Sequence, residues 1–240
     1  MTELQRRRRA LMGQKSSSAH GTWADLFRAI DAGTYATEYA QGETIELDLG
    51  STLGVMQMEI SDFNLDNKAD GTGKAPVTLI SQNLMTPAVR FNPALQGESG
   101  NYTVGTGTIG GWKESEVRSW FINTVLPAIP LNVRSRLVEV IKASQSFNSA
   151  GTKVGNELTY DLVFCPSYRE CGRNNEETGN AGTYFALNGN SKRQKGPDWG
   201  LRSSATTSNR GKISTTGRID SAIQLGAQNT VRTLLCFCVG

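Results

Sequence analysis

Apolar residues recur every three or four positions near the start of the chain, a spacing that places them on one face of a helix. They are Trp23, Leu26, Phe27 and Ile30. Thr22 precedes them as a candidate N-cap with Asp25 at the third helical position, which is a capping-box-like arrangement. Gly33 is expected to end this helix.

Strict alternation of apolar and polar residues follows and predicts a β-hairpin. Residues 45–49 and 55–60 each place alternate apolar side chains on one face, and a turn at residues 50–54 would join them. Residues 75–80 predict a further short strand, and residues 81–108 are expected to be mostly loop.

A second helical pattern begins after Gly110-Gly111, with acidic residues early in it, as the helix dipole favours. Its apolar face consists of Val117, Trp120, Phe121 and Val125. Pro127 is expected to stop this helix, and Pro130 to be the first residue of the next one. The inward-facing residues of that next helix would be Leu137, Val140 and Ile141.

The last third of the chain changes to a β pattern. Strands are predicted at residues 158–164 and 183–187 and in the closing apolar segment 231–239. Residues 169–182 are expected to form a loop too polar to pack, and residues 191–196 to be basic and exposed. Helices in the first half and strands throughout predict an α+β fold.

The first residues have a pattern of their own. Residues 3–12 have high helix propensity, with Leu4, Leu11 and Met12 on one stripe. A helix this short is not stable alone, so we expect it to dock onto another copy or a larger assembly. The Arg6–Arg9 run could instead bind nucleic acid or an anionic surface, but the flanking apolar residues favour docking. Residues 1–21 are therefore expected to form a docking helix and linker, and residues 22–240 one domain.

Composition narrows the classes of function. The 240 residues suffice for one substantial core, and the net charge of +3 comes from the N-terminal arginines, so the body of the protein is near neutral. We therefore expect no nucleic-acid partner. A secretory signal and a membrane-spanning stretch are both absent from the sequence, which predicts synthesis in a cytoplasm and release by lysis or within an assembled particle.

No cofactor or metal is predicted. Cys165 and Cys171, and Cys236 and Cys238, lack the short spacing of a zinc knuckle, so reduced structural cysteines are expected, with zinc as the alternative. Residues 62–71 resemble the start of a calcium loop, but Asn67 occupies the position that needs glycine. A polar loop with Asx turns is favoured there over calcium.

A polar segment near the C-terminus is the candidate binding site. Trp199 and Arg202 are expected to be buried supports, and the small polar residues after them to be presented to a ligand. The predicted ligand-binding residues are Ser204, Thr206, Thr207, Ser208, Asn209, Arg210 and Lys212. Their side chains offer hydrogen-bond donors and acceptors, and they include no pairing of nucleophile and base.

Several motifs, in order, resemble an uncharacterised domain family of gut Gram-positive bacteria and their phages. The motifs are the hairpin, residues 66–75, Gly110-Gly111-Trp112, residues 188–191, residues 199–203 and Val231-Arg232. This resemblance implies a C-type lectin-like fold with a short N-terminal helical arm. Gly200 and Ser204 depart from the family pattern, which usually has a second aromatic residue and a proline there. Residues 3–12 also resemble the N-termini of prophage tail proteins.

The resemblance implies a phage virion protein, at the tail tip, a fibre or another exposed site, that binds a glycan or protein of the host cell surface. Its expected location is the virion, with residues 1–18 contacting other virion proteins. A homo-oligomer, most simply a trimer, is expected because multivalency strengthens weak contacts. The alternatives are a purely structural or decorative virion component and, in a different class, an oxidase of the formylglycine-generating type, which shares this fold. We expect no enzymatic activity, because the one histidine, His20, lies in the linker and Cys236 and Cys238 suit packing.

Overall fold

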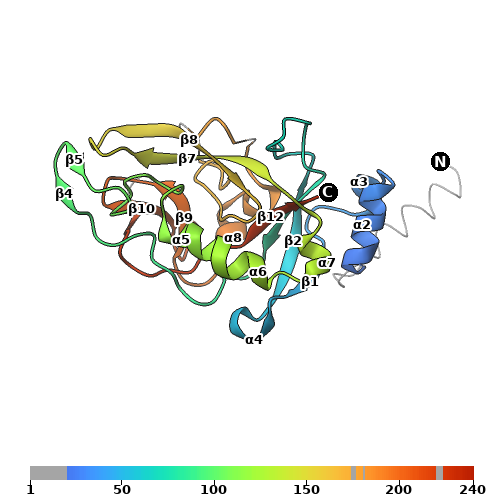
Figure 1. Ribbon diagram of the computed structural model, residues 1–240. Coiled ribbons are helices and arrows are strands. Elements are labelled where there is room, and N and C mark those ends of the chain that lie inside the picture. The colour runs from blue at the N-terminus through green and yellow to red at the C-terminus, as the bar shows by residue number, and fades with distance from the viewer. Residues whose placement is uncertain (1–20, 174–176, 181, 220–223) are drawn as a thin grey trace, which may run out of the picture.

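The computed structural model describes residues 21–173, 177–180, 182–219 and 224–240 (Figure 1). Every pairing between its named strands is antiparallel, and short helices lie around the sheets. The α+β prediction is therefore confirmed. The predicted helix at residues 3–12 and most of the linker, including His20, lie outside the described residues.

The central sheet has five strands in the order β1-β2-β3-β12-β6. Its strands are β1 (Thr44–Asp48), β2 (Val55–Phe63), β3 (Val77–Ser81), β12 (Cys236–Val239) and β6 (Leu137–Val138). The predicted hairpin is confirmed, with the short helix α4 (Gly50–Leu53) in its turn. The C-terminal strand β12 lies between β3 and β6 and is buried throughout, although it is shorter than the predicted segment.

Helix α2 (Trp23–Asp31) packs on this sheet and begins as predicted. The Thr22 hydroxyl accepts from the Asp25 N–H, and the Asp25 carboxylate accepts from the Thr22 N–H at 2.9 Å. The Trp23 ring lies 6.1 Å from that of Phe237 in β12, and its indole N–H donates to the Glu46 carbonyl in β1. The short helix α3 (Tyr35–Glu38) follows.

The second predicted helical region is a chain of short turns: α5 (Glu116–Trp120), the π-helical turn η1 (Phe121–Val125) and α6 (Leu126–Ala128). Pro127 was expected to stop this helix, but it lies within α6, just after the wider π turn. Pro130 is the N-cap of α7 (Leu131–Arg134) and not its first residue.

The prediction that the helix after Pro130 continues to Ile141 was wrong, because the helix ends with α7. Leu137 belongs to β6, and Val140 and Ile141 begin β7 (Val140–Phe147), which pairs along its length with β8 (Lys153–Asp161). The predicted strand at residues 183–187 was also wrong, because that segment forms the 3₁₀ turn η2 (Phe185–Leu187). The short helix α8 (Asn190–Arg193) follows it.

A second sheet and a small hairpin lie away from α2. The sheet has the order β11-β10-β9, with β9 (Trp199–Ser204), β10 (Asn209–Ile213) and β11 (Gln224–Gly226). The hairpin consists of β4 (Gly97–Glu98) and β5 (Asn101–Tyr102).

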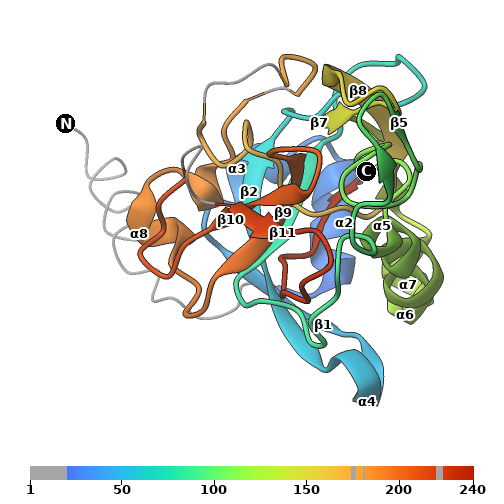
Figure 2. The same ribbon diagram turned by 90° about the vertical axis from the view of Figure 1, so that its left-hand side faces the viewer.

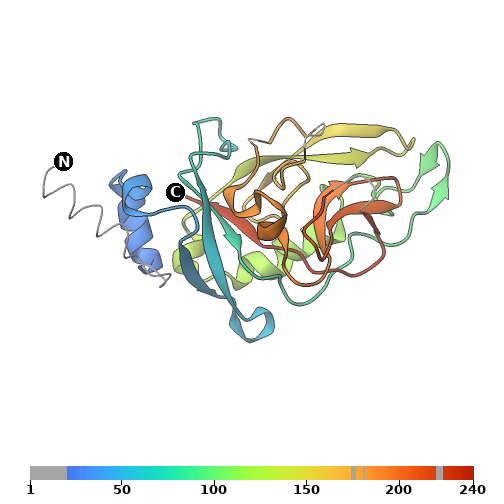
Figure 3. The same cartoon turned by 180° about the vertical axis from the view of Figure 1, so that it is seen from behind.

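The molecule is elongated, with α2 and α3 at one end and the β4–β5 hairpin at the other (Figures 1 and 3). The tip of the β7–β8 hairpin and the turn between β9 and β10 share the end with β4 and β5, and Figure 2 views the molecule from that side. Within the part of the chain that the structure describes, no helix is both long and apolar enough to span a bilayer.

Candidate binding surface

The supports predicted beneath the binding site are confirmed as core residues. Trp199 and Arg202 in β9 are both completely buried. The Trp199 indole donates to the Arg193 carbonyl at 2.9 Å. Arg202 joins four other buried residues in what we call the core charge cluster: Asp66, Lys142, Glu170, Tyr184 and Arg202.

Lys142 stands at the centre of the core charge cluster. Its ammonium group donates to Asp66 Oδ1 at 2.5 Å, to the Tyr184 hydroxyl at 2.6 Å and to Glu170 Oε1 at 3.1 Å. The Tyr184 hydroxyl is also within hydrogen-bond distance of both carboxylates. All three ammonium hydrogens therefore have acceptors, as burial of a charge requires.

Arg202 completes the cluster from the other side of Glu170. Its guanidinium donates to both Glu170 oxygens, at 2.5 and 2.9 Å, in a bidentate pair. Further acceptors are the Cys165 carbonyl, Asn180 Oδ1 and Ser144 Oγ. Two cations and two acids are thus balanced inside the protein.

The charges in this cluster shift one another's pKa values. Burial alone would raise the pKa of Glu170, but the charges of Arg202 and Lys142 outweigh it and hold the pKa at about 2. Burial would lower the pKa of Lys142, yet Asp66 and Glu170 raise it above its usual value. Because no member is more than 2% exposed, the cluster is not accessible to a ligand; it joins side chains that are distant in the sequence within the core.

The loop that was expected to be too polar to pack is in fact part of the core. Glu170, Cys171, Glu177 and Asn180 are buried, and the Asn180 side chain bonds to both the N–H and the carbonyl of Ala143 in β7. Arg193, expected in an exposed basic stretch, is also buried and donates to the carbonyls of nearby turns. These polar residues pack because the chain itself supplies their partners.

Two of the seven predicted ligand-binding residues are not available to a ligand. Ser204 and Arg210 are completely buried, so the expectation that they are exposed was wrong. The Arg210 guanidinium packs on Gly200 and lies 5.2 Å from the centre of the Phe91 ring. Its Nε donates to the Leu201 carbonyl, but its two terminal nitrogens have no hydrogen-bond partner among the residues that the structure describes. Burial lowers the pKa of Arg210 to about 10.

The other five predicted residues are half-buried: Thr206, Thr207, Ser208, Asn209 and Lys212. The Thr206 hydroxyl accepts from the N–H groups of Ser208 and Asn209, which fixes the turn between β9 and β10. Lys212 forms an ion pair with Asp198 at 2.6 Å. This turn is therefore fixed by hydrogen bonds and an ion pair, and it is not the flexible exposed loop that was expected.

Further exposed residues, which the sequence pattern did not indicate, lie next to the turn between β9 and β10. We define the distal loop face as residues 96–104, 148–153 and 205–209. Asn101, Val104 and Asn148 are exposed there, Val104 to 54%. Apart from the glycines at their turns, nothing in the sequence distinguishes these polar segments from ordinary connecting loops.

The three segments of the distal loop face are joined by direct contacts. The Tyr102 N–H donates to the Ser149 carbonyl at 2.7 Å. Thr108, which follows the first segment but lies outside the face, donates from its N–H and its hydroxyl to the carbonyls of Thr207 and Thr206. A Cβ at Gly151 would lie 2.9 Å from the Tyr102 ring and 3.8 Å from Thr207. The face is therefore a continuous surface built from distant parts of the chain.

The candidate metal and thiol residues have structural roles. Asp66 belongs to the core charge cluster, Asp62 accepts from the Phe185 N–H, and Asp70 accepts from the Thr72 N–H in the predicted Asx turn. Among the described residues, no group of three or more His, Cys, Asp or Glu side chains is arranged to hold a metal.

All four cysteines are free and buried, as expected of structural thiols. They are Cys165, Cys171, Cys236 and Cys238. Burial raises the pKa of each thiol, which disfavours the reactive thiolate.

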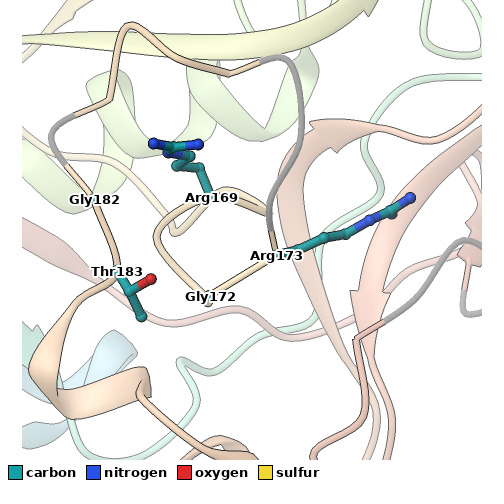
Figure 4. A pocket seen from close by; sticks show the side chains of 5 residues that line it. All are labelled: Arg169, Gly172, Arg173, Gly182 and Thr183. Atoms are coloured by element: carbon teal, nitrogen blue, oxygen red, sulfur yellow. The ribbon is translucent and has the colours of Figure 1, made fainter.

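A hollow of about 230 Å³ beside the 169–182 loop is lined by two arginines. The side chains of Arg169 and Arg173 point in different directions from the turn at Gly172 (Figure 4). The Arg173 guanidinium lies 4.4 Å from the centre of the Tyr168 ring. The two cations do not converge on one point, so this hollow is not arranged as an anion site.

Comparison with known proteins gives one match. A family model described as "Domain of unknown function (DUF6273)" matches residues 77–238. The matched segment contains the distal loop face and every member of the core charge cluster except Asp66. It also contains the strands β3 to β12, of which only the last residue of β12 lies outside it. No curated protein and no solved structure matches the chain. Because the matched segment covers more than half of the sequence, the chain belongs to the DUF6273 family of domains of unknown function.

Proposed function

We propose that this protein is a phage virion protein that binds a ligand on the surface of a host bacterium through its distal loop face. The observation that carries the proposal is the position of this face. It lies at the end of the molecule opposite α2, so a chain held by its N-terminal segment would present the face outward (Figures 1 and 3).

The construction of the distal loop face favours binding. Of its three polar segments, residues 96–104 and 148–153 are joined by a backbone hydrogen bond, and residues 205–209 are held by hydrogen bonds from Thr108, next to the first segment. Such an arrangement allows the exposed side chains to vary at small cost, since surface substitutions usually change stability by about 0.5 kcal/mol or less. A rigid frame also lowers the entropy lost when a ligand binds.

We infer a C-type lectin-like fold for residues 22–240. Support comes from the antiparallel sheets, from the C-terminal strand inserted between β3 and β6 of the main sheet and from the loops gathered at one end. The sequence resemblance that suggested this fold includes Gly110-Gly111-Trp112 and Trp199 to Ser203, which are core elements. A purely decorative virion component would share this fold but would not need a binding face.

Cell attachment by paired variants tests the proposal. In the distal variant, Asn101, Val104 and Asn148 are replaced by alanine. The control variant replaces Ser51, Thr52 and Val55 by alanine; these residues are also exposed but lie on and beside α4, away from the distal loop face. Fluorescently labelled protein is then incubated with intact host cells.

The distal variant should lose attachment by roughly tenfold or more, and the control variant should attach like the unmodified protein. Equal thermal unfolding midpoints for the three proteins establish that the fold is intact. Undiminished attachment of the distal variant would contradict the proposed binding face. Failure of the unmodified protein to attach to any host cell would favour a decorative role.

A further inference from the structure

We propose that a second site, on the flank of the molecule between the α5–η1–α6 chain and β8, binds a neutral saccharide ring. This flank pocket has a volume of about 240 Å³ and lies outside the distal loop face. The proposal goes beyond cell attachment by the distal loop face and does not depend on it.

One wall of the flank pocket is apolar. It is formed by Ile122, Leu126, Leu162 and Val163. At its rim the Tyr160 side chain is 53% exposed and Ile122 is 40% exposed, and both line the same hollow. An aromatic ring and aliphatic groups left in water beside a concave surface are typical of ligand sites. The C–H face of a sugar ring packs well on such a wall.

Arg118 is a fixed donor on the polar side of the pocket. Its Nε donates to Asp161 Oδ1 at 2.8 Å, and its Nη2 donates to the Tyr160 carbonyl at 3.3 Å. Asp161 is itself buried and accepts from the Trp112 indole at 2.9 Å and from the Thr159 hydroxyl at 2.6 Å. Arg118 is thus positioned by a carboxylate that two further groups hold in place.

One nitrogen of Arg118 remains for a ligand. The contacts above use Nε and Nη2, while Nη1 has no partner among the described residues and the side chain is 21% exposed. Glu139 also lines the pocket, is exposed, and has no side-chain hydrogen bond or ion pair within the described chain. Beside its apolar wall the pocket therefore offers the Arg118 Nη1 donor, the Glu139 carboxylate as acceptor and the Tyr160 hydroxyl, which can do either.

The balance of charge in the flank pocket disfavours an anionic ligand. Asp161 already neutralises Arg118, so Glu139 leaves the pocket with an excess of negative charge. An anion would be repelled, and a purely apolar group would leave both polar groups without partners. Adjacent hydroxyl groups on a sugar ring can accept from Arg118 and donate to Glu139 while the ring covers the apolar wall.

The backbone of the pocket wall gives an independent indication. Ile122 belongs to η1, a single π-helical turn between two α-helical turns. Such turns are rare and occur frequently at functional sites, because the widened turn changes the direction of its side chains.

Ligand-observed NMR with methyl glycosides tests the proposal. The full chain is titrated with the methyl glycosides of glucose, galactose, N-acetylglucosamine and rhamnose, and with methyl glucuronide as a charged counterpart. We expect at least one neutral glycoside to bind with a Kd in the millimolar range, as suits a single small ring. The glucuronide should bind more weakly than the glucoside, and Glu139→Gln should reduce that difference.

Tyr160→Ala should weaken binding of the neutral glycoside roughly tenfold, whereas Leu158→Ala should leave it unchanged. Leu158 is a matched control because it is exposed on the same face of β8, two residues away, but does not line the pocket. A neutral apolar amide, acetylphenylalanine amide, and a small cation, methylammonium, are titrated alongside the glycosides. The proposal is overturned if no glycoside binds, if Tyr160→Ala binds as well as the unmodified protein, or if only the amide or only the cation binds. None of these results bears on the distal variant, which leaves the flank pocket intact.

Discussion

Arg202 and Arg210 are both fully buried in the second sheet, but their surroundings differ. Arg202 faces Glu170 in a bidentate pair, whereas the terminal nitrogens of Arg210 have no hydrogen-bond partner within the described part of the chain. Replacing a buried charged residue that has an oppositely charged partner strongly destabilises the fold, because the partner's charge is then left buried and unpaired. A buried charge without one contributes little, and its burial already lowers its pKa to about 10.

We therefore predict opposite outcomes for two identical substitutions. Arg202→Met should lower the free energy of unfolding by roughly 3–5 kcal/mol, since it removes the bidentate ion pair of the buried Glu170 and leaves it only the longer ion pair with Lys142 within the described chain. Arg210→Met should be neutral or stabilising, since methionine fills a similar space beside Phe91 without an unpaired charge. Urea unfolding of the two variants measures both values. A loss for Arg210→Met as large as that for Arg202→Met would show that Arg210 has a partner in solution.

The lowered pKa of Glu170 predicts a loss of stability in acid. An acid whose pKa falls from 4.5 to about 2 on folding stabilises the protein above pH 4.5, and this contribution disappears as the pH falls towards 2. Urea unfolding midpoints between pH 7 and pH 2.5 should therefore decrease below pH 4.5. Glu170→Gln should be less stable at pH 7 but should show a shallower decrease, which separates Glu170 from the other carboxylates.

At the scale of elements, Gly111 fixes the approach of the α5 segment to the β7–β8 hairpin. Its φ is +57°, and a Cβ there would lie 2.3 Å from the Ser146 Cβ and 2.6 Å from Glu157 Oε2. This glycine places Trp112 so that its indole reaches Asp161, and thereby fixes Arg118. The Gly110-Gly111-Trp112 motif thus allows close packing beneath the flank pocket and positions Arg118 through Asp161.

Gly111→Ala should accordingly lower the free energy of unfolding by more than about 2 kcal/mol, from backbone strain and overlap together. Gly33→Ala is the matched control, because Gly33 also has a positive φ, +70°, but open space around it. It should cost only about 1 kcal/mol. Thermal or urea unfolding distinguishes the two, and equal losses would mean that the hairpin shifts to accommodate the new methyl group.

The sequence pattern predicted those elements in which one face is apolar. Helix α2 with its capping box and the β1–β2 hairpin follow directly from spacing. Strand β7 could not be recognised, because the cluster and its neighbours bury polar side chains along it, Lys142 and Ser144 among them. Leu137, Val140 and Ile141 happen to have helical spacing, but pairing with β8 determines the conformation. Burial of the 169–182 loop likewise depends on partners that are distant in sequence.

The same limit applies to the candidate binding surface. Trp199 and Arg202 could be assigned to the core from their place before a polar segment, and that assignment is confirmed. Arg210 could not, because an arginine among serines and threonines has the sequence context of a surface residue. The distal loop face joins residues 101, 148 and 207 only through tertiary contacts, which no local pattern encodes.

At the scale of the whole molecule, the distal loop face and α2 lie at opposite ends (Figures 1 and 3). Copies joined through residues 1–18 would therefore present several distal loop faces in one direction. Linked weak sites bind a repetitive cell surface far more strongly than single ones, by a factor of up to about 10²–10⁴. Oligomerisation and ligand contact should thus be separable properties of the chain.

Deletion of residues 1–18 should leave a folded monomer that attaches weakly. The unfolding midpoint should be unchanged, since the described core begins after these residues. Light scattering at micromolar concentration should give a trimer mass for the full chain and a monomer mass for the truncated one, with half-maximal attachment to cells shifted at least about tenfold higher. The distal variant supplies the complementary control, because it should remain trimeric while attachment is lost. A monomeric full chain, or a truncated chain that still forms trimers, would contradict the docking role of the N-terminal segment.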